Sequence, residues 1–176
     1  INVSGNSITN LSGTSGNVYG IRLGTSNIVA SNVRIENNDI RIPTIVSGGV
    51  DIRGISFDVG FNVSVLRIEN NNIVNNFDTP NFFVNNGITV SAIEGYSGVV
   101  EQLFIKNNLI DGVMLSDDFV YGIYIANVGR AMISGNTLTN IGNNYEDVNG
   151  SRIVGIQIAA TSGFVDIHNN ILKDCD

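Results

Sequence analysis

Charged residues are scarce in this chain, and basic ones are scarcer still. Lys, Arg, Asp and Glu make up 14% of the 176 residues, and nine basic residues face sixteen acidic ones, giving a net charge of −7. Neutralising phosphates requires a stripe of Lys and Arg, so we expect no nucleic-acid partner. The single Cys, Cys175, allows no internal disulfide. The sequence contains no apolar run of 18 residues, the length that would predict a membrane-spanning helix, so we expect no membrane partner.

Asparagine and glycine are abundant instead, with 27 Asn and 20 Gly. Both residue types favour tight turns, and 43% hydrophobic residues suffice for a substantial core. The composition therefore predicts an all-β protein, and its length suits a single domain over residues 1–176.

Two short motifs alternate along the chain. The first, Gly-Ile-x-φ (φ, apolar), begins at Gly20, Gly54, Gly87, Gly122 and Gly155, with steps of 34, 33, 35 and 33 residues. The second, φ-x-Asn-Asn-x-Ile with some substitutions, is anchored at Asn6, Asn38, Asn71, Asn108, Asn136 and Asn170. A period of about 33 residues predicts a solenoid of stacked units.

Within each motif, apolar and polar residues alternate with a period of two, which predicts strands with one buried face. Copies in register are expected to stack in parallel and to place two columns of apolar side chains in the interior. The expected columns are Ile21, Ile55, Ile88, Ile123, Ile156 and Leu23, Phe57, Val90, Ile125, Ile158. Asparagine tolerates left-handed backbone, so the Asn-Asn pairs are expected to form corners; Gly5 and Gly135, which replace the first Asn, agree with that conformation.

These motifs resemble the right-handed parallel β-helix of the pectate-lyase-like superfamily, and more specifically its tailspike and adhesin types. The resemblance implies an all-β, right-handed parallel β-helix of about five coils, with three short strands per coil. The six anchoring asparagines would form an asparagine ladder along one corner.

The outward column of the first strand is the first candidate for ligand binding. It is expected to contain Arg22, Ser56, Thr89, Tyr124 and Gln157. In the resembling family, grooves on this face hold extended sugars, which implies a polysaccharide or surface glycan as the partner. The competing interpretation is an ordinary solvated surface, to which polar side chains are equally suited.

An acidic cluster is the second candidate site. Asp111, Asp117 and Asp118, with Arg130 as a basic partner, would be catalytic only if the chain is an enzyme, and the same carboxylates are candidate calcium ligands. We expect no other metal or cofactor. Galacturonan hydrolases carry four motifs, of which only the Asp-Asp pair is present, and a solvated acidic turn is the alternative interpretation.

Taken together, the sequence favours a rigid β-helical domain of an extracellular, cell-surface or virion protein, such as a tailspike, fibre or adhesin, that presents loops to carbohydrate or a receptor. The alternatives are a polysaccharide lyase or hydrolase, and a structural filament subunit that stacks end to end. Neither end shows a capping helix, so we expect part of a longer chain, or a homo-oligomer that is either a trimer or an end-to-end stack.

Overall fold

The computed structural model describes residues 1–9, 17–24, 28–42, 51–58, 61–75, 89–112, 119–142, 152–159 and 163–175. Every regular element in these ranges is a β-strand, and none is a helix that could cross a membrane. The strands are β1 (Asn2–Ser4), β2 (Ser7–Ile8), β3 (Val18–Leu23), β4 (Ile28–Glu36), β5 (Asp39–Ile42), β6 (Ile52–Phe57), β7 (Phe61–Glu69), β8 (Asn72–Asn75), β9 (Thr89–Lys106), β10 (Leu109–Asp111), β11 (Phe119–Ser134), β12 (Thr137–Thr139), β13 (Arg152–Ala159), β14 (Val165–His168) and β15 (Ile171–Lys173).

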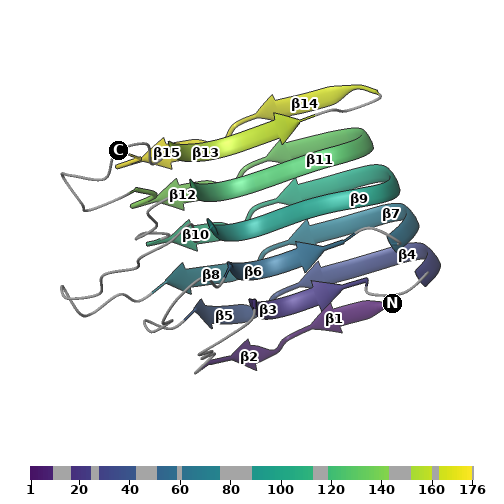
Figure 1. Cartoon of the computed structure of the whole chain (residues 1–176), viewed down its shortest axis with the longest axis horizontal. Coiled ribbons are helices and arrows are strands. Elements are labelled where there is room, and N and C mark those ends of the chain that lie inside the picture. Colours follow the sequence, from purple (N-terminus) through teal and green to yellow (C-terminus); the bar gives the residue numbers. More distant parts are fainter. Residues whose placement is uncertain are drawn as a thin grey trace.

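All strand pairs are parallel, so the protein is a parallel β-solenoid (Figure 1). Three faces follow from the pairing. The first sheet joins β3, β6, β9, β11 and β13; the second joins β1, β4, β7, β9, β11 and β14; the third has six strands in the order β2, β5, β8, β10, β12, β15. Each strand lies next to its counterpart in the neighbouring coil, as the repeat predicts.

The expected five coils of three short strands are found in only part of the solenoid. Three coils consist of three separate strands: β3 to β5, β6 to β8, and β13 to β15. Elsewhere the first two strands merge into β9, of 18 residues, and β11, of 16 residues, which turn the corner between the first and second sheets without a break (Figure 1). At the bend the pairing of β9 with β11 shifts register between Ala126 and Val128, where Asn127 is left-handed with φ 56°.

The interior holds stacked apolar side chains, but one repeat lies in a different place from the one predicted. Ile55 pairs with Ile93, and Phe57 pairs with Gly95, so Ala92-Ile93-Glu94-Gly95 is the third copy of the first motif. The prediction that Ile88 and Val90 fill these columns is wrong: Val90 pairs with Ile52 one column earlier, and Ile88 lies outside the described residues.

Packing explains why the third copy departs from the motif. Phe57 is fully buried, and its ring occupies the space that a side chain at position 95 would need. A Cβ built on Gly95 would overlap that ring. The large side chain of Phe57 therefore fills, in one layer of the core, both its own place and the place left empty by Gly95 in the next coil.

The predicted asparagine ladder is confirmed, and it forms the corner between the second and third sheets. At each step the side-chain oxygen of one Asn accepts hydrogen bonds from the backbone N–H and the side-chain amide of its counterpart in the preceding coil. Asn108 Oδ1, for example, lies 2.9 Å from Asn71 N and 3.0 Å from Asn71 Nδ2. The ladder contains Asn6, Asn38, Asn71, Asn108, Asn136 and Asn170.

The residue before each ladder position is left-handed, as expected. Positive φ angles between 54° and 67° occur at Gly5, Asn37, Asn70, Asn107, Gly135 and Asn169. Asn and Gly are the residues that reach this conformation at least cost, which explains the Asn-Asn and Gly-Asn pairs in the sequence.

The glycine of the first motif leaves no room for a side chain. A Cβ on Gly122 would lie 2.6 Å from the carbonyl oxygen of Gly155 in the next coil and 2.5 Å from Leu138 Cδ2. We predict that Gly122→Ala lowers the free energy of unfolding by about 1–3 kcal/mol, because the two coils must move apart. Denaturant unfolding monitored by circular dichroism measures this change.

The third copy supplies a matched control, because Ala92 already carries a methyl group and is fully buried. Ala92→Gly is expected to cost about 1 kcal/mol. If Gly122→Ala is as stable as the native chain, the claim that neighbouring coils lie too close at Gly122 to admit a methyl group is wrong.

Candidate functional site

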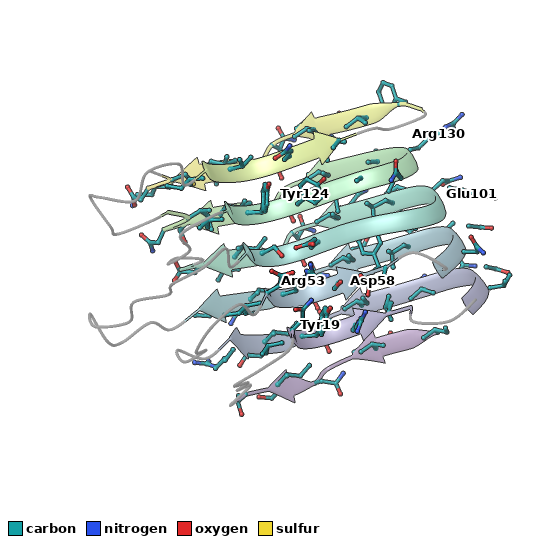
Figure 2. The ribbon with its side chains drawn as sticks, viewed as in Figure 1. Tyr19, Arg53, Asp58, Glu101, Tyr124 and Arg130 are labelled. Carbon is teal, nitrogen blue, oxygen red and sulfur yellow. The ribbon has the colours of Figure 1, made fainter. Side chains whose placement is uncertain are left out.

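The outer face of the first sheet carries two adjacent columns of side chains, which we call the first-sheet face. One column contains Tyr19, Arg53, Ser91, Tyr121 and Val154. The other contains Arg22, Ser56, Glu94, Tyr124 and Gln157. Figure 2 shows the labelled Tyr19, Arg53 and Tyr124, which lie on β3, β6 and β11 of this sheet.

Four of the five residues predicted for the outward column occupy it, and the fifth does not. Thr89 pairs with Phe119 at the start of β9, whereas Glu94 pairs with both Ser56 and Tyr124. The misplacement has the same cause as that of Val90: the sequence Gly87-Ile88-Thr89-Val90 matches the motif, but Ala92-Ile93-Glu94-Gly95 pairs with the second copy.

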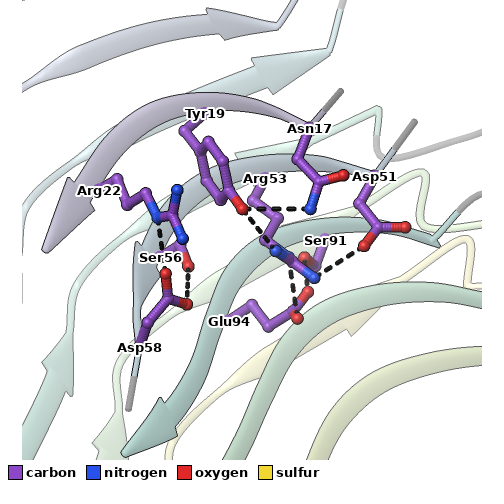
Figure 3. A network of polar contacts seen from close by, with 9 residues as sticks. All are labelled: Asn17, Tyr19, Arg22, Asp51, Arg53, Ser56, Asp58, Ser91 and Glu94. Carbon is purple, nitrogen blue, oxygen red and sulfur yellow. Dashed lines mark hydrogen bonds and ion pairs between the residues drawn. The ribbon is translucent and has the colours of Figure 1, made fainter. Parts of the chain in front are cut away.

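Tyr19 is the centre of the lower part of this face. The guanidinium carbon of Arg22 lies 4.4 Å from the centroid of its ring, and that of Arg53 lies 5.5 Å away. The hydroxyl accepts hydrogen bonds from Arg53 Nη1 at 3.0 Å and Asn17 Nδ2 at 3.2 Å (Figure 3). These contacts fix the ring and occupy its acceptor positions, so they leave the hydroxyl hydrogen for donation.

Arg53 links the surface to a buried carboxylate. Its Nε lies 2.9 Å from Glu94 Oε1, in an ion pair without the alignment of a hydrogen bond, and its Nη2 donates to Asp51 Oδ2 at 2.8 Å. Ser91 donates a short hydrogen bond to the other oxygen of Glu94. The Glu94 side chain is only 1% exposed, and Arg53 is the cation paired with it.

The pKa of Arg53 reflects this environment. Burial alone disfavours the guanidinium, but the negative charges of Glu94 and Asp51 outweigh that effect and raise the pKa of Arg53 above its ordinary value. Arg53 therefore carries a fixed positive charge that its own carboxylate partners already balance.

Arg22 is held in a similar way at the rim. Its Nε donates to Asp58 Oδ2 at 2.6 Å, and the other oxygen of Asp58 accepts from Ser56 Oγ at 3.1 Å (Figure 3). Arg22 remains 40% exposed, whereas Ser56 is fully buried. Among the described side chains of this face, Arg22 is thus the accessible arginine, and the carboxylate of Asp58 sets its position.

The upper part of the face is aromatic. The rings of Tyr121 and Tyr124 lie 4.9 Å apart, centroid to centroid, and are tilted by 47°. Tyr124 is half-buried, and Gln157 follows it in the column. Polar groups that pair with one another and tyrosine rings therefore share one surface across four coils.

The described residues of the predicted acidic site do not come together. Asp111 ends β10 in the third sheet, and its Oδ1 accepts hydrogen bonds from Thr139 Oγ1 and Asn140 Nδ2, both at 2.7 Å. Arg130 lies on the part of β11 that belongs to the second sheet (Figure 2). Asp117 and Asp118 lie outside the described residues, so the carboxylate pair and its calcium remain predictions. Within the described ranges no three His, Cys, Asp or Glu side chains group as metal ligands do.

A hollow of about 220 Å3 lies on the second sheet and is lined by Phe104, Arg130, Met132 and Phe164, among others. The Phe104 ring is flanked by two cations: Arg67 Cζ lies 4.4 Å from its centroid and Lys106 Nζ lies 5.0 Å from it. This hollow is on a different face from Tyr19 and Glu94, and it provides comparison residues for the tests below.

Sequence reasoning missed Tyr19, Arg53 and Glu94 as members of one cluster. Tyr19 and Arg53 each precede a motif glycine, a position that is polar or aromatic in four of the five copies of the motif. Glu94 had no such signal, because its motif has Ala in place of Gly.

Comparison of the chain with protein-family models, with curated proteins and with solved structures finds no match.

Proposed function

We propose that this chain is a rigid β-solenoid domain of an extracellular, cell-surface or virion protein, which binds a surface glycan on its first-sheet face. The observation that carries the proposal is the alignment of tyrosine rings and self-paired polar groups in adjacent columns over four coils. The resemblance of the repeat to pectate-lyase-like, tailspike and adhesin β-helices agrees with this function, since sugars bind to the corresponding face in that family.

The chemistry of a glycan suits this surface. A sugar ring offers C–H groups that stack on aromatic rings and hydroxyls that both donate and accept hydrogen bonds. Tyr19 and Tyr124 supply amphipathic rings, and Arg22 and Gln157 supply donors and acceptors between them. Because cation–π contacts and hydrogen bonds already hold Tyr19 and an ion pair holds Arg22, little side-chain freedom is lost when a ligand binds.

An enzyme has less support. Asp111 is hydrogen-bonded to Thr139 and Asn140 on the third sheet, and Arg130 lies on the second sheet, so these two members of the predicted acidic site do not share one groove. The glycan-binding function is therefore the one we carry forward.

Binding of the native chain to a glycan array, followed by titration of the best ligand, tests the proposal. We predict that Tyr19→Ala and Tyr124→Ala each weaken binding at least about tenfold, through loss of a stacked ring. Phe104→Ala, which removes an aromatic ring from the second sheet, is the matched control and is expected to leave affinity unchanged. Thermal unfolding verifies that each variant is folded.

Two results would overturn the proposal. One is the absence of binding to any glycan by the native chain. The other is binding that Phe104→Ala abolishes while both tyrosine variants retain it.

A further inference from the structure

We infer that the ligand of the first-sheet face is an uncharged glycan, and not a uronic acid polymer or a sulfated one. This inference rests on the proposed function and specifies the class of glycan. It follows from where every basic residue of the chain lies.

The two arginines whose side chains are described on this face are already neutralised. Arg22 pairs with Asp58 at 2.6 Å, and Arg53 pairs with Asp51 at 2.8 Å and with Glu94 at 2.9 Å. Two positive charges thus stand beside three negative ones, which leaves this cluster with a net charge of −1. An anionic sugar would meet no positive charge that lacks a carboxylate partner.

One more basic residue belongs to this sheet. Arg152 begins β13 and pairs with Phe119, and its side chain is not among those described. With the positive charge of Arg152 included, the net charge of these groups on the first-sheet face is zero at most. The remaining six of the nine basic residues belong to the other two sheets: Arg34, Arg41, Arg67, Lys106, Arg130 and Lys173.

The segments outside the described ranges cannot supply the missing cations. Their sequences contain no Lys or Arg, whereas six of the sixteen acidic residues fall there: Asp78, Asp117, Asp118, Glu146, Asp147 and Asp176. Wherever these segments lie, they add negative charge or none. The field near any loop-lined groove therefore disfavours an anion.

An uncharged glycan suits what remains. The face offers tyrosine rings, the amide of Gln157 and the exposed edge of Arg22, and these groups recognise hydroxyls and C–H surfaces without requiring an opposite charge. Binding of such a ligand is expected to depend little on salt, since no ion pair with the ligand forms.

The test titrates the native chain with three oligosaccharide series: uncharged hexose oligomers, oligogalacturonates and sulfated oligosaccharides. We expect the best uncharged oligomer to bind at least about tenfold more tightly than any anionic one. Its affinity is expected to change less than about twofold between about 0.05 M and about 0.5 M NaCl. Asp58→Asn removes the partner of Arg22 and is expected to increase the affinity for oligogalacturonate at low salt.

Asp39→Asn is the matched control. Asp39 pairs with Arg41 at 3.2 Å on the third sheet, so this variant makes the same change in charge away from the first-sheet face. The inference predicts no gain in oligogalacturonate affinity for it.

The possible outcomes separate the two proposals. If an anionic series binds the native chain most tightly and Arg22→Gln abolishes that binding, the inference is overturned while glycan binding at this face stands. If equal gains appear in Asp58→Asn and Asp39→Asn, only net charge matters and the inference is overturned as well. If no series binds the native chain, the proposed function fails and the inference fails with it.

Discussion

Replacing Asn108 with alanine is expected to lower the free energy of unfolding by about 3–5 kcal/mol. Asn108 is 1% exposed and lies within the ladder. Its oxygen accepts from the backbone and side-chain amides of Asn71, and its own amide donates to Ile68 O at 2.9 Å and to Asn136 Oδ1 at 2.9 Å. Removing the side chain breaks four buried hydrogen bonds, including the one donated by Asn71 N, and a buried polar group that loses its partner costs about 1–3 kcal/mol.

The neighbouring residue provides the control. Asn107 has φ 54° and is exposed, so Asn107→Gly keeps the left-handed corner and is expected to change stability by less than about 0.5 kcal/mol. Denaturant unfolding of the two variants measures the difference. If Asn108→Ala is as stable as Asn107→Gly, the ladder does not hold the coils together.

Replacing Arg53 with methionine is expected to cost about 3–5 kcal/mol, because Glu94 would be left buried with its charge unbalanced. The raised pKa of Arg53 sets the pH range of this effect. A cation whose pKa is higher in the folded state contributes its full stabilisation below its ordinary pKa and loses it only as the pH rises through the folded value, so the pair is expected to act across the whole neutral range.

A double-mutant cycle isolates the pair. Glu94→Gln removes the buried charge, so Arg53→Met is expected to cost less in that background than in the native chain by about 1–3 kcal/mol. Arg22→Met, at a pair in which the arginine is 40% exposed, is the control and is expected to cost about 1 kcal/mol or less. Additive effects of Arg53→Met and Glu94→Gln would contradict a coupled, buried ion pair.

Local signals in the sequence predicted the corners and most of the core. The left-handed positions and the ladder depend on residues one or two apart, such as Asn107 and Asn108, whose chemistry determines the turn. The alternation of Ile123 and Ile125 with Tyr124 likewise follows from the period of a strand.

The register of the third coil was not predictable from the motif. Gly87-Ile88 imitates the repeat, and only the fit of the Phe57 ring over Gly95, between residues 38 positions apart, distinguishes the correct alignment. An error in register misassigns every residue of that segment, so the predicted site contained Thr89 at the position that Glu94 occupies. Side-chain partners across coils, such as Arg53 and Glu94, depend on that register and could not be read from either segment alone.

The proposed glycan site is tested most directly by locating a bound sugar on the protein. An NMR titration of the native chain, labelled at Tyr and Phe, with the best uncharged oligosaccharide locates the contact. We predict that the ring signals of Tyr19 and Tyr124 shift in proportion to occupancy while those of Phe104 and Phe164 on the second sheet stay in place. Shifts confined to Phe104 and Phe164, with Tyr19 and Tyr124 unmoved at saturation, would contradict a glycan site on the first-sheet face.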